Sequence, residues 1–412
     1  MDCGKVQGRH PVMTSQPRIA SGCRVRFAGT ADLPAVRRFN ARLAAGGVSY
    51  QIPGDFRLPG EALHRPPGYP VFRELMIAED ASEMRAGVLL QHGTFFVRNE
   101  ARPFSWLQLP LSEGLINPVH ARAFLVLMLE CTRREPFLGS LGVGAMDEKW
   151  ARFLVGLGWK TRPIPFFFYP VRPNRVFLGL EHLRRKARLQ FAARAAVYSG
   201  AATALGAGLA LRRRFTGASG RYIAVETPVF DSWADNVFFD NQPKYGATPR
   251  RDSAALNILY PPSESSYVRL RVQAKDGGRD IGWVLLVHAR MRDNKYFGDL
   301  HVGTIVTGFG DPADAPVLIH AGLTHLIRLG ADLVVGNWSH SSWQSACRGL
   351  GFLPGPSNFL LFLSPGSAPL LSAGCPLEET HLTRGDCDSP SSLMPRKQPH
   401  DPRDTRTFKR TG

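Results

Sequence analysis

Several patterns that carry chemistry in other proteins are missing from this sequence. Its six cysteines lie far apart, with no Cys-x-x-Cys pair and no histidine at zinc-finger spacing, so the common structural zinc sites are excluded. There is no Gly-x-Ser-x-Gly elbow and no Walker phosphate loop, which disfavours a serine hydrolase and a nucleoside triphosphatase. No metal site is expected. The scattered cysteines fit a reducing compartment, and we expect a cytoplasmic protein.

Long apolar runs are also scarce. Residues Met1 to Pro17 contain no continuous apolar segment, so we expect no secretory signal peptide. The most apolar stretch, Ala195 to Leu211, is at the lower limit of length for a membrane span and is rich in alanine and glycine. It is interpreted as an inter-domain helix that packs on protein. A peripheral contact with the inner membrane through its basic flanks is the alternative.

Acidic residues are fewer than basic ones. The chain has 34 Asp and Glu and 51 Lys and Arg, which gives a formal net charge of +17. Such a surplus attracts anions of any kind, including nucleic acid, anionic lipid and a phosphorylated cofactor such as coenzyme A. Charge alone therefore does not identify the partner. The basic residues near the C-terminus are interpreted as solvated rather than as a nucleic-acid arm, so nucleic acid is not an expected partner.

What the chain does contain is typical of two globular domains. Its 412 residues exceed the roughly 250–300 at which a single core usually stops growing. The predicted order of strands and helices in the first half favours a mixed α/β sheet covered by helices. The resulting division is a disordered N-terminus (1–22), domain one (23–172), a basic helical linker (173–220), domain two (221–364) and a disordered tail (365–412).

A pattern in domain one recurs in domain two. The stretch from Trp150 to Trp159 aligns without gaps on Trp343 to Phe352, at an offset of 193 residues (343 minus 150). At the same offset Phe166 meets Phe359. A tryptophan, a Gly-Leu-Gly-aromatic motif and a later phenylalanine that recur in register indicate the duplication of a whole domain.

The repeated motif resembles the closing helix and the leucine-glycine-phenylalanine turn of GNAT (Gcn5-related N-acetyltransferase) domains. In each half a helix ends in Leu, Gly and an aromatic residue, at 157–159 and 350–352. Val25 to Val36 resembles the family's first strand and helix, and Asp332 to Asn337 its fifth strand. Arg251 to Asn257 is similar to a stretch in two-domain GNAT-like proteins found with bacterial exopolysaccharide genes.

This resemblance implies two tandem GNAT-like domains of mixed α/β fold, related by duplication. It also implies an N- or O-acyltransferase that uses acetyl-CoA or another acyl-CoA as co-substrate. The acceptor would be an amine or a hydroxyl compound, which the sequence does not identify further, and the oligomeric state stays open as well.

The resemblance also suggests where the cofactor would lie. GNAT domains bind the pyrophosphate of coenzyme A through the backbone N–H groups of a glycine-rich loop before their central helix, and neither half of this sequence has the usual loop. Gly308 and Gly310 can still make a backbone nest for phosphate. Asp311 and Asp314 would repel phosphate and are interpreted as helix N-caps. Asn337 follows the fifth strand, where the thioester enters, with a turn or cap role as the alternative. The predicted cofactor-binding residues are Gly308, Gly310 and Asn337.

Transfer of an acyl group to an amine needs a base and a proton donor for the leaving thiolate. Asp299 and His301 lie on one face of a predicted strand, and His301 is the predicted base. A hydrogen-bonded, half-buried histidine is the alternative interpretation. The family's usual tyrosine acid falls on Leu154 and Cys347, so a water relay would have to serve. Glu113 is the corresponding carboxylate in domain one, with simple solvent exposure as its alternative.

We therefore expect the active site in domain two, between the strand that carries His301 and the strand that ends at Asn337. Domain one is the poorer candidate because the proline of Asn117-Pro118 removes an N–H group that a phosphate would need. Ser339 is interpreted as the cap of the closing helix. The alternative function is a catalytically inactive GNAT-like protein that serves as a binding module.

Overall fold

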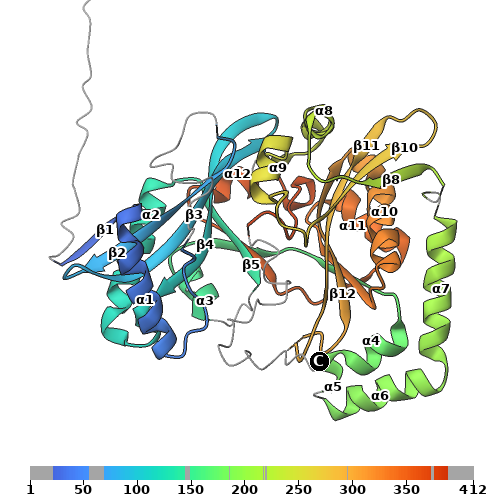
Figure 1. Ribbon diagram of the computed structural model, residues 1–412, viewed down its shortest axis with the longest axis horizontal. Coiled ribbons are helices and arrows are strands. Elements are labelled where there is room, and N and C mark those ends of the chain that lie inside the picture. Colours follow the sequence, from blue (N-terminus) through green and yellow to red (C-terminus); the bar gives the residue numbers. More distant parts are fainter. Residues whose placement is uncertain are drawn as a thin grey trace, which may run out of the picture.

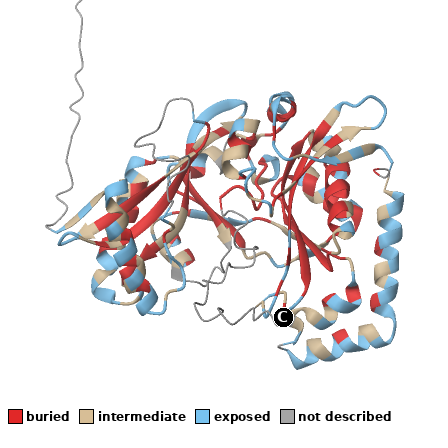
Figure 2. Ribbon diagram, in the orientation of Figure 1, coloured by how far each residue is buried: buried red, intermediate tan, exposed pale blue. Residues whose placement is uncertain are grey.

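The computed structural model describes residues 22–54, 69–143, 149–184, 186–216, 218, 220–294, 296–372 and 375–387. The strands form two mixed sheets, with helices packed against both, and the two sheets lie side by side (Figure 1). Buried residues concentrate on the strands and on the helix faces that touch them (Figure 2).

Domain one begins with strand β1 (Cys23–Phe27) and helix α1 (Leu33–Ala45). The helix buries Val36, Phe39 and Leu43, whose spacing places them on one face. The elements that follow are β2 (Phe72–Asp80), β3 (Glu83–Val97), β4 (Glu100–Ser112), α2 (Ala121–Arg134), β5 (Leu138–Val143), α3 (Lys149–Gly156), β6 (Lys160–Pro163) and β7 (Phe166–Pro170).

Domain two repeats this order, with two helices and a short strand in place of α1. Its elements are β8 (Tyr222–Glu226), α8 (Ser232–Asn241), β9 (Ala247–Pro249), α9 (Ser253–Leu259), β10 (Val268–Ala274), β11 (Asp280–Arg290), β12 (His301–Gly310), α10 (Ala315–Arg328), β13 (Leu333–Asn337), α11 (Ser341–Leu350), β14 (Leu353–Gly355) and β15 (Phe359–Leu363).

The strand orders of the two sheets confirm the predicted duplication. The first sheet runs β1-β2-β3-β4-β5-β15-β6, and the second, read from its β8 edge, runs β8-β10-β11-β12-β13-β7-β14. Trp150 lies on α3 and Trp343 on the equivalent helix α11. Gly158 and Gly351, which end these helices, both have left-handed backbones, with φ of 83° and 94°. The offset of 193 residues found in the sequence therefore pairs equivalent helices and the glycines that end them.

The two domains exchange their last strands. Strand β7 of domain one pairs with β13 and β14 in the second sheet, while β15 of domain two pairs with β5 and β6 in the first. The boundary drawn at residue 172 assigned β7 to the sheet of domain one, and the structure corrects this assignment. Both strands are continuous apolar runs, typical of central strands, and such a run fits either sheet equally well. Each sheet is therefore completed only by the other half of the chain.

The helical linker lies on the outer flank of domain two rather than between the domains (Figure 1). It consists of α4 (Pro173–Gly179), α5 (Glu181–Arg184), α6 (Ala187–Tyr198) and α7 (Ala201–Phe215). Because β7 is already in the second sheet, the linker joins two strands of the same sheet, and the inter-domain placement expected from the sequence is corrected. No helix within the described ranges is long and apolar enough to cross a membrane.

The predicted disordered tail is wrong for the part of it that the structure describes. After α12 (Ala368–Ser372), residues 375–387 run back between the two sheets. Cys375, Leu382 and Cys387 are buried in one apolar cluster with Trp106 of domain one. The segment has too few apolar residues to fold alone, but it completes a core that both sheets supply. The rest of the expected disorder, 1–21 and 388–412, lies outside the described residues.

Candidate functional site

His301 lies far from the predicted cofactor residues. It begins β12 and Gly310 ends it, so at about 3.3 Å per residue they are roughly 30 Å apart. The imidazole is buried, with Nε2 3.0 Å from Nδ1 of His288 and Nδ1 3.1 Å from the carbonyl oxygen of Gly330. Burial, and then the neighbouring His288, lower the pKa of His301. The arrangement is that of a hydrogen-bonded core histidine at the end of the sheet opposite the start of α10.

Asp299 does not join His301 as a catalytic partner. Its side chain is exposed, and Oδ1 accepts a 3.0 Å hydrogen bond from the backbone N–H of Asp293, which orders the loop between β11 and β12. The carboxylate next to His301 is instead Asp332, which accepts from the backbone N–H of His301 at 3.0 Å. The predicted face of Asp299 and His301 is thus not assembled.

Gly308 and Gly310 are paired in a β-ladder and do not form a phosphate nest. They lie opposite Val284 and Gly282 of β11. A Cβ atom would come within 2.8 Å of Val284 at Gly308 and within 2.5 Å of the Ile281 carbonyl oxygen at Gly310. Close strand packing therefore explains both glycines, and the predicted role in holding pyrophosphate is corrected.

The N-terminus of α10 is already satisfied by the protein. Asp311 accepts a 2.8 Å hydrogen bond from the N–H of Ala313, and Lys244 lies 2.6 Å from the same carboxylate. Burial opposes ionisation of Asp311, but the bonds from Lys244 and Ala313 outweigh it, and the pKa is lowered. Pro312 and Pro316 supply no N–H groups. A phosphate would meet a negative charge here instead of free donors, as the interpretation of Asp311 as an N-cap anticipated.

The strands that carry His301 and Asn337, between which the site was expected, are separated by an opening at one end. β12 and β13 pair in parallel only from Val302 and Leu333 to Ile305 and Gly336, and then diverge. The register of β12 against β11 shifts at this point, as a β-bulge requires. Asn337 ends β13 at the opening. Its Nδ2 points to the carbonyl oxygen of Pro165 at 3.3 Å, and its buried Oδ1 has no hydrogen-bond partner in the part of the chain that the structure describes.

Residues 380–386, which we call the plug segment, fill this opening. The N–H of Gly385 donates to the carbonyl oxygen of Val306 at 3.2 Å, and Nε2 of His381 lies 2.8 Å from the carbonyl oxygen of Gly308. On the other side, Ser339 bonds through Oγ to the backbone N–H of Leu382 at 2.7 Å. The plug segment thus takes the place of a strand between the diverging ends of β12 and β13.

Ser339 is consequently not the cap of the closing helix. That role belongs to His340, whose Nδ1 accepts from the N–H of Ser342 at 3.2 Å. Burial lowers the pKa of His340 to about 4 and that of His381 well below its usual value. Both imidazoles are therefore neutral near pH 7, in an aromatic cluster that includes the stacked rings of Trp338 and Trp343.

A larger space lies on the outer side of α11, which we call the α10–α11 groove. It is a cavity of about 470 Å³ between the start of α10 and the exposed face of α11. Arg212 of α7 donates to the carbonyl oxygen of Gly349, one of the groove residues, at 2.9 Å, and so brings a guanidinium group to the rim. The groove is lined on the α10 side by Pro312, Ala313 and Pro316 and on the α11 side by Ser341, Ser342 and Ser345.

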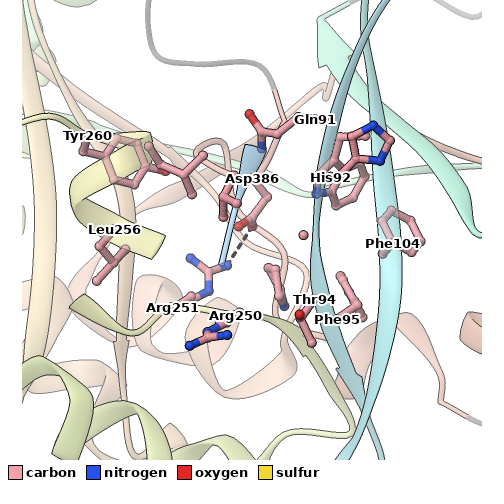
Figure 3. A pocket seen from close by; sticks show the side chains of 15 residues that line it. Gln91, His92, Thr94, Phe95, Phe104, Arg250, Arg251, Leu256, Tyr260 and Asp386 are labelled. Carbon is pink, nitrogen blue, oxygen red and sulfur yellow. Dashed lines mark hydrogen bonds and ion pairs between the residues drawn. The ribbon is translucent and has the colours of Figure 1, made fainter. Parts of the chain in front are cut away.

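A smaller cavity, the interdomain cleft, lies between the face of β3 and β4 and the loop that precedes α9 (Figure 3). Its roughly 30 Å³ of room suits about two water molecules. Arg251 and Asp386 meet there, with 2.7 Å between Nη2 and Oδ2. Arg251 also bonds to the hydroxyl of Thr307 and, at 3.2 Å, to the carbonyl oxygen of His381. It therefore connects the cleft to the plug segment.

No protein-family model matches the chain, and no curated protein matches it. Several solved structures are similar to the chain. A tandem GNAT protein from the clavulanic acid biosynthesis pathway is 11% identical with a TM-score of 0.44, over 84% of this chain and 98% of that one. A Saccharomyces cerevisiae N-myristoyltransferase with bound myristoyl-CoA is 10% identical with a TM-score of 0.45, over 87% and 88%. A GCN5-related N-acetyltransferase from Anabaena variabilis is 9% identical with a TM-score of 0.48, over 82% and 72%.

The two sheets of this chain repeat one strand order, and its similarity to these solved structures extends over most of its length. The stretch from Arg251 to Asn257 has a clear structural use. Asp252 caps α9 by accepting from the N–H of Ala255 at 2.9 Å, and Asn257 binds both backbone groups of Phe230. These bonds fix the helix so that Arg251 points into the interdomain cleft.

Two features of the structure were not predicted from the sequence. The first is the plug segment, which lies in a stretch whose composition predicted disorder. The second is a buried polar chain in domain one, where Ser105 bonds to His92 at 2.8 Å and to Glu135 at 2.9 Å, and Glu74 lies 3.4 Å from His92. These residues come from separate elements, and no local motif in the sequence marks them.

Glu113 is also buried, paired with Arg42 and Arg85, so the solvent exposure considered for it is corrected.

Proposed function

We propose that the protein is an acyltransferase that binds an acyl-CoA donor in domain two and passes the acyl group to an amine or hydroxyl acceptor. The observation that carries this proposal is the α10–α11 groove of about 470 Å³, in the same domain as the diverging strands β12 and β13. A donor of this kind needs an extended site for its carrier and an opening in the sheet for its thioester. Domain two combines both features.

The donor's phosphates would lie toward α11 and α7 rather than at the start of α10. Asp311 carries a negative charge at α10, whereas the groove side of α11 presents the hydroxyl groups of Ser341 and Ser345. The positive end of the α11 dipole is at Ser341, which lines the groove. Arg212 at the rim adds a permanent positive charge, and it is held there because its Nε and Nη2 donate to the carbonyl oxygens of Gly349 and Arg348. Asn337 remains a proposed contact for the donor near the thioester.

The plug segment limits the acyl group that domain two can accept. Its hydrogen bonds to Val306, Gly308 and Ser339 leave no room for a long chain between the two strands. A short acyl group at the mouth of the opening does not require these bonds to break. Acetyl-CoA is therefore the donor we propose, in preference to long-chain acyl-CoA.

His381 is better placed than His301 to accept the acceptor's proton. With its Nε2 at 2.8 Å from the carbonyl oxygen of Gly308, the tautomer that donates there leaves a lone pair on Nδ1. Nδ1 is buried and has no hydrogen-bond partner among the residues that the structure describes. The low pKa of His381 keeps the ring neutral at physiological pH. Arg251, which lines the interdomain cleft, binds the backbone carbonyl oxygen of His381 and so links the cleft to this histidine.

Calorimetric titration with acetyl-CoA tests the proposal. Ser345→Trp would fill the groove, and we expect it to weaken binding at least tenfold. Arg152→Trp is the matched control, because residue 152 is the exposed position on α3 that corresponds to 345 at the offset of 193 residues (345 minus 152). The control should bind like the unmodified protein. Equal binding by both variants would place the donor elsewhere.

A second candidate function is a GNAT-like binding module without catalysis. It is favoured by the satisfied N-terminus of α10 and by the filled opening between β12 and β13. Absence of any binding of acetyl-CoA by the unmodified protein, at concentrations up to the millimolar range, would select this candidate over the acyltransferase.

A further inference from the structure

The linker helices carry a stretch of chain without negative charge. Between Glu181 and Glu226 there is no Asp or Glu, while nine residues are Lys or Arg. Helices α6 and α7 make up most of this stretch and lie along the outer edge of domain two (Figure 1). Most of their surface is exposed (Figure 2). The molecule therefore presents a strongly basic flank on two adjacent helices.

Large apolar side chains stand out from α6 in the middle of this basic flank. Phe191 is 76% exposed and Tyr198 is 84% exposed. They are seven residues apart, which places them on the same face of the helix, opposite the buried Ala193. Arg188 and Arg194 are exposed on either side of that face. α6 thus presents apolar and basic side chains together on the face that points away from the protein core.

Helix α7 repeats this arrangement at its end. Leu211 is 58% exposed and Phe215 is 75% exposed, and their spacing of four residues places them on one face. The opposite face is buried through Ala202 and Leu209. Exposed arginines at 212 and 214 adjoin the two apolar residues. Both helices therefore combine protruding apolar side chains with arginine, and neither apolar face packs on another part of the described chain.

We propose that α6 and α7 form a docking surface for an anionic lipid membrane. Aromatic side chains that protrude between arginines suit the boundary between headgroups and acyl chains, where the rings enter the apolar layer and the guanidinium groups bind phosphates. The absence of acidic residues over the whole stretch removes repulsion from an anionic surface. The helices lie on the membrane and do not cross it, since neither is long enough to span the bilayer.

Lipid fits this surface better than nucleic acid or a protein partner does. The exposed faces of α6 and α7 consist mainly of alanine, glycine, leucine, aromatic residues and arginine. Few amide or hydroxyl side chains are present to read bases or to form the polar rim of a protein interface. The tie between α7 and α11 through Arg212 would hold the α10–α11 groove near the membrane. The docking surface does not depend on the proposed acyltransferase activity.

Co-sedimentation with vesicles tests this inference. The unmodified protein should sediment with vesicles of phosphatidylcholine and phosphatidylglycerol, and should stay in solution with phosphatidylcholine alone. Phe191→Ser with Tyr198→Ser, and separately Arg188→Glu with Arg194→Glu, should each weaken binding to the anionic vesicles at least tenfold. Circular dichroism would confirm that both variants are folded.

Matched controls remove similar groups elsewhere. Val119→Ser with Leu129→Ser removes two apolar side chains that are 80% and 53% exposed on and near α2. Arg24→Glu with Arg37→Glu reverses two exposed arginines of domain one. Both controls should bind vesicles like the unmodified protein. The inference is overturned if the unmodified protein does not sediment, if the controls lose as much binding as the α6 variants, or if mixed-sequence RNA displaces the protein from vesicles and binds through the same residues.

Discussion

Arg251 and Asp386 form a buried ion pair between the loop before α9 and the plug segment, with 2.7 Å between Nη2 and Oδ2. Their side chains are only 3% and 6% exposed. Asp386 also accepts a hydrogen bond from the N–H of Thr383 at 2.6 Å. The same carboxylate therefore stabilises the turn of the plug segment and binds it to Arg251. This pair is the main polar link that keeps the plug segment in the opening of domain two.

Removal of both partners should cost less stability than the two single removals added together. Arg251→Met leaves the carboxylate buried without its counter-ion, and we expect the free energy of unfolding to fall by about 3 to 5 kcal/mol. Asp386→Leu should have a comparable effect. The double variant should lose clearly less than the sum, because the pair is deleted together. Urea denaturation of the four proteins measures this, and strictly additive losses would show that the pair does not act as a unit.

The buried histidines predict how stability depends on pH. Burial lowers the pKa of His340 to about 4, below the value of about 6.5 for an unfolded histidine. The folded state then binds fewer protons than the unfolded state between these values. The stability contributed by neutral His340 is complete above about pH 6.5 and is lost as the pH falls toward 4. His381 and His301 are shifted in the same direction.

His340→Asn isolates this contribution, since asparagine can still accept the hydrogen bond that caps α11. We expect the difference in unfolding free energy between pH 7 and pH 5 to be smaller in this variant than in the unmodified protein. Denaturant titrations at the two pH values provide the measurement. An unchanged difference would mean that His340 is not among the groups that titrate on acid unfolding.

The strand exchange predicts that neither half of the chain folds alone. A fragment of residues 22–220 lacks β15, which separates β5 from β6 and is buried from Phe359 to Leu363. Its β7 would expose Phe167 and Tyr169, whose partners are in domain two. We expect this fragment to be unfolded or aggregated by circular dichroism and gel filtration. Co-expression with residues 221–412 should restore a folded complex, and a folded monomeric fragment would contradict the prediction.

The fold could be predicted well from the sequence because the duplication is visible in short, local residue patterns. The motif that begins at Trp150 and recurs at Trp343 fixes two equivalent helices, turns and strands without reference to contacts across the molecule. The sheet that the last strand of each half joins could not be predicted in this way. Phe166–Pro170 and Phe359–Leu363 are both continuous apolar runs, and only the three-dimensional path of the chain decides which sheet each one enters.

The candidate site was harder to predict because its residues are joined by long-range contacts. Gly308 and Gly310 have the composition of a phosphate loop, yet their role is to let β12 and β11 approach closely. His301 is nearby in sequence but at the wrong end of the strand. His381 and Asp386 are in a polar segment whose burial depends on surfaces that other elements build. Composition describes a segment by itself and does not include those surfaces.

His301, the base predicted from the sequence, and His381, the proposed base, should respond differently to substitution. His301→Gln alters a hydrogen-bonded core position at the start of β12, so we expect lower stability but an unchanged affinity for acetyl-CoA and a kcat within a few-fold of the original. His381→Gln keeps a group that can donate to the carbonyl oxygen of Gly308 but cannot accept a proton. If His381 is the proton acceptor, kcat should fall by roughly 10²- to 10⁴-fold while acetyl-CoA affinity is retained.

Steady-state kinetics and calorimetry on both variants separate these effects, with thermal denaturation to show that each protein is folded at the assay temperature. The comparison is informative because both rings are buried and both have lowered pKa values, so burial and charge alone do not distinguish them. What distinguishes them is position, since only His381 lies where β12 and β13 diverge. A large loss of kcat with His301→Gln and none with His381→Gln would reverse the assignment and place proton transfer at the other end of the sheet.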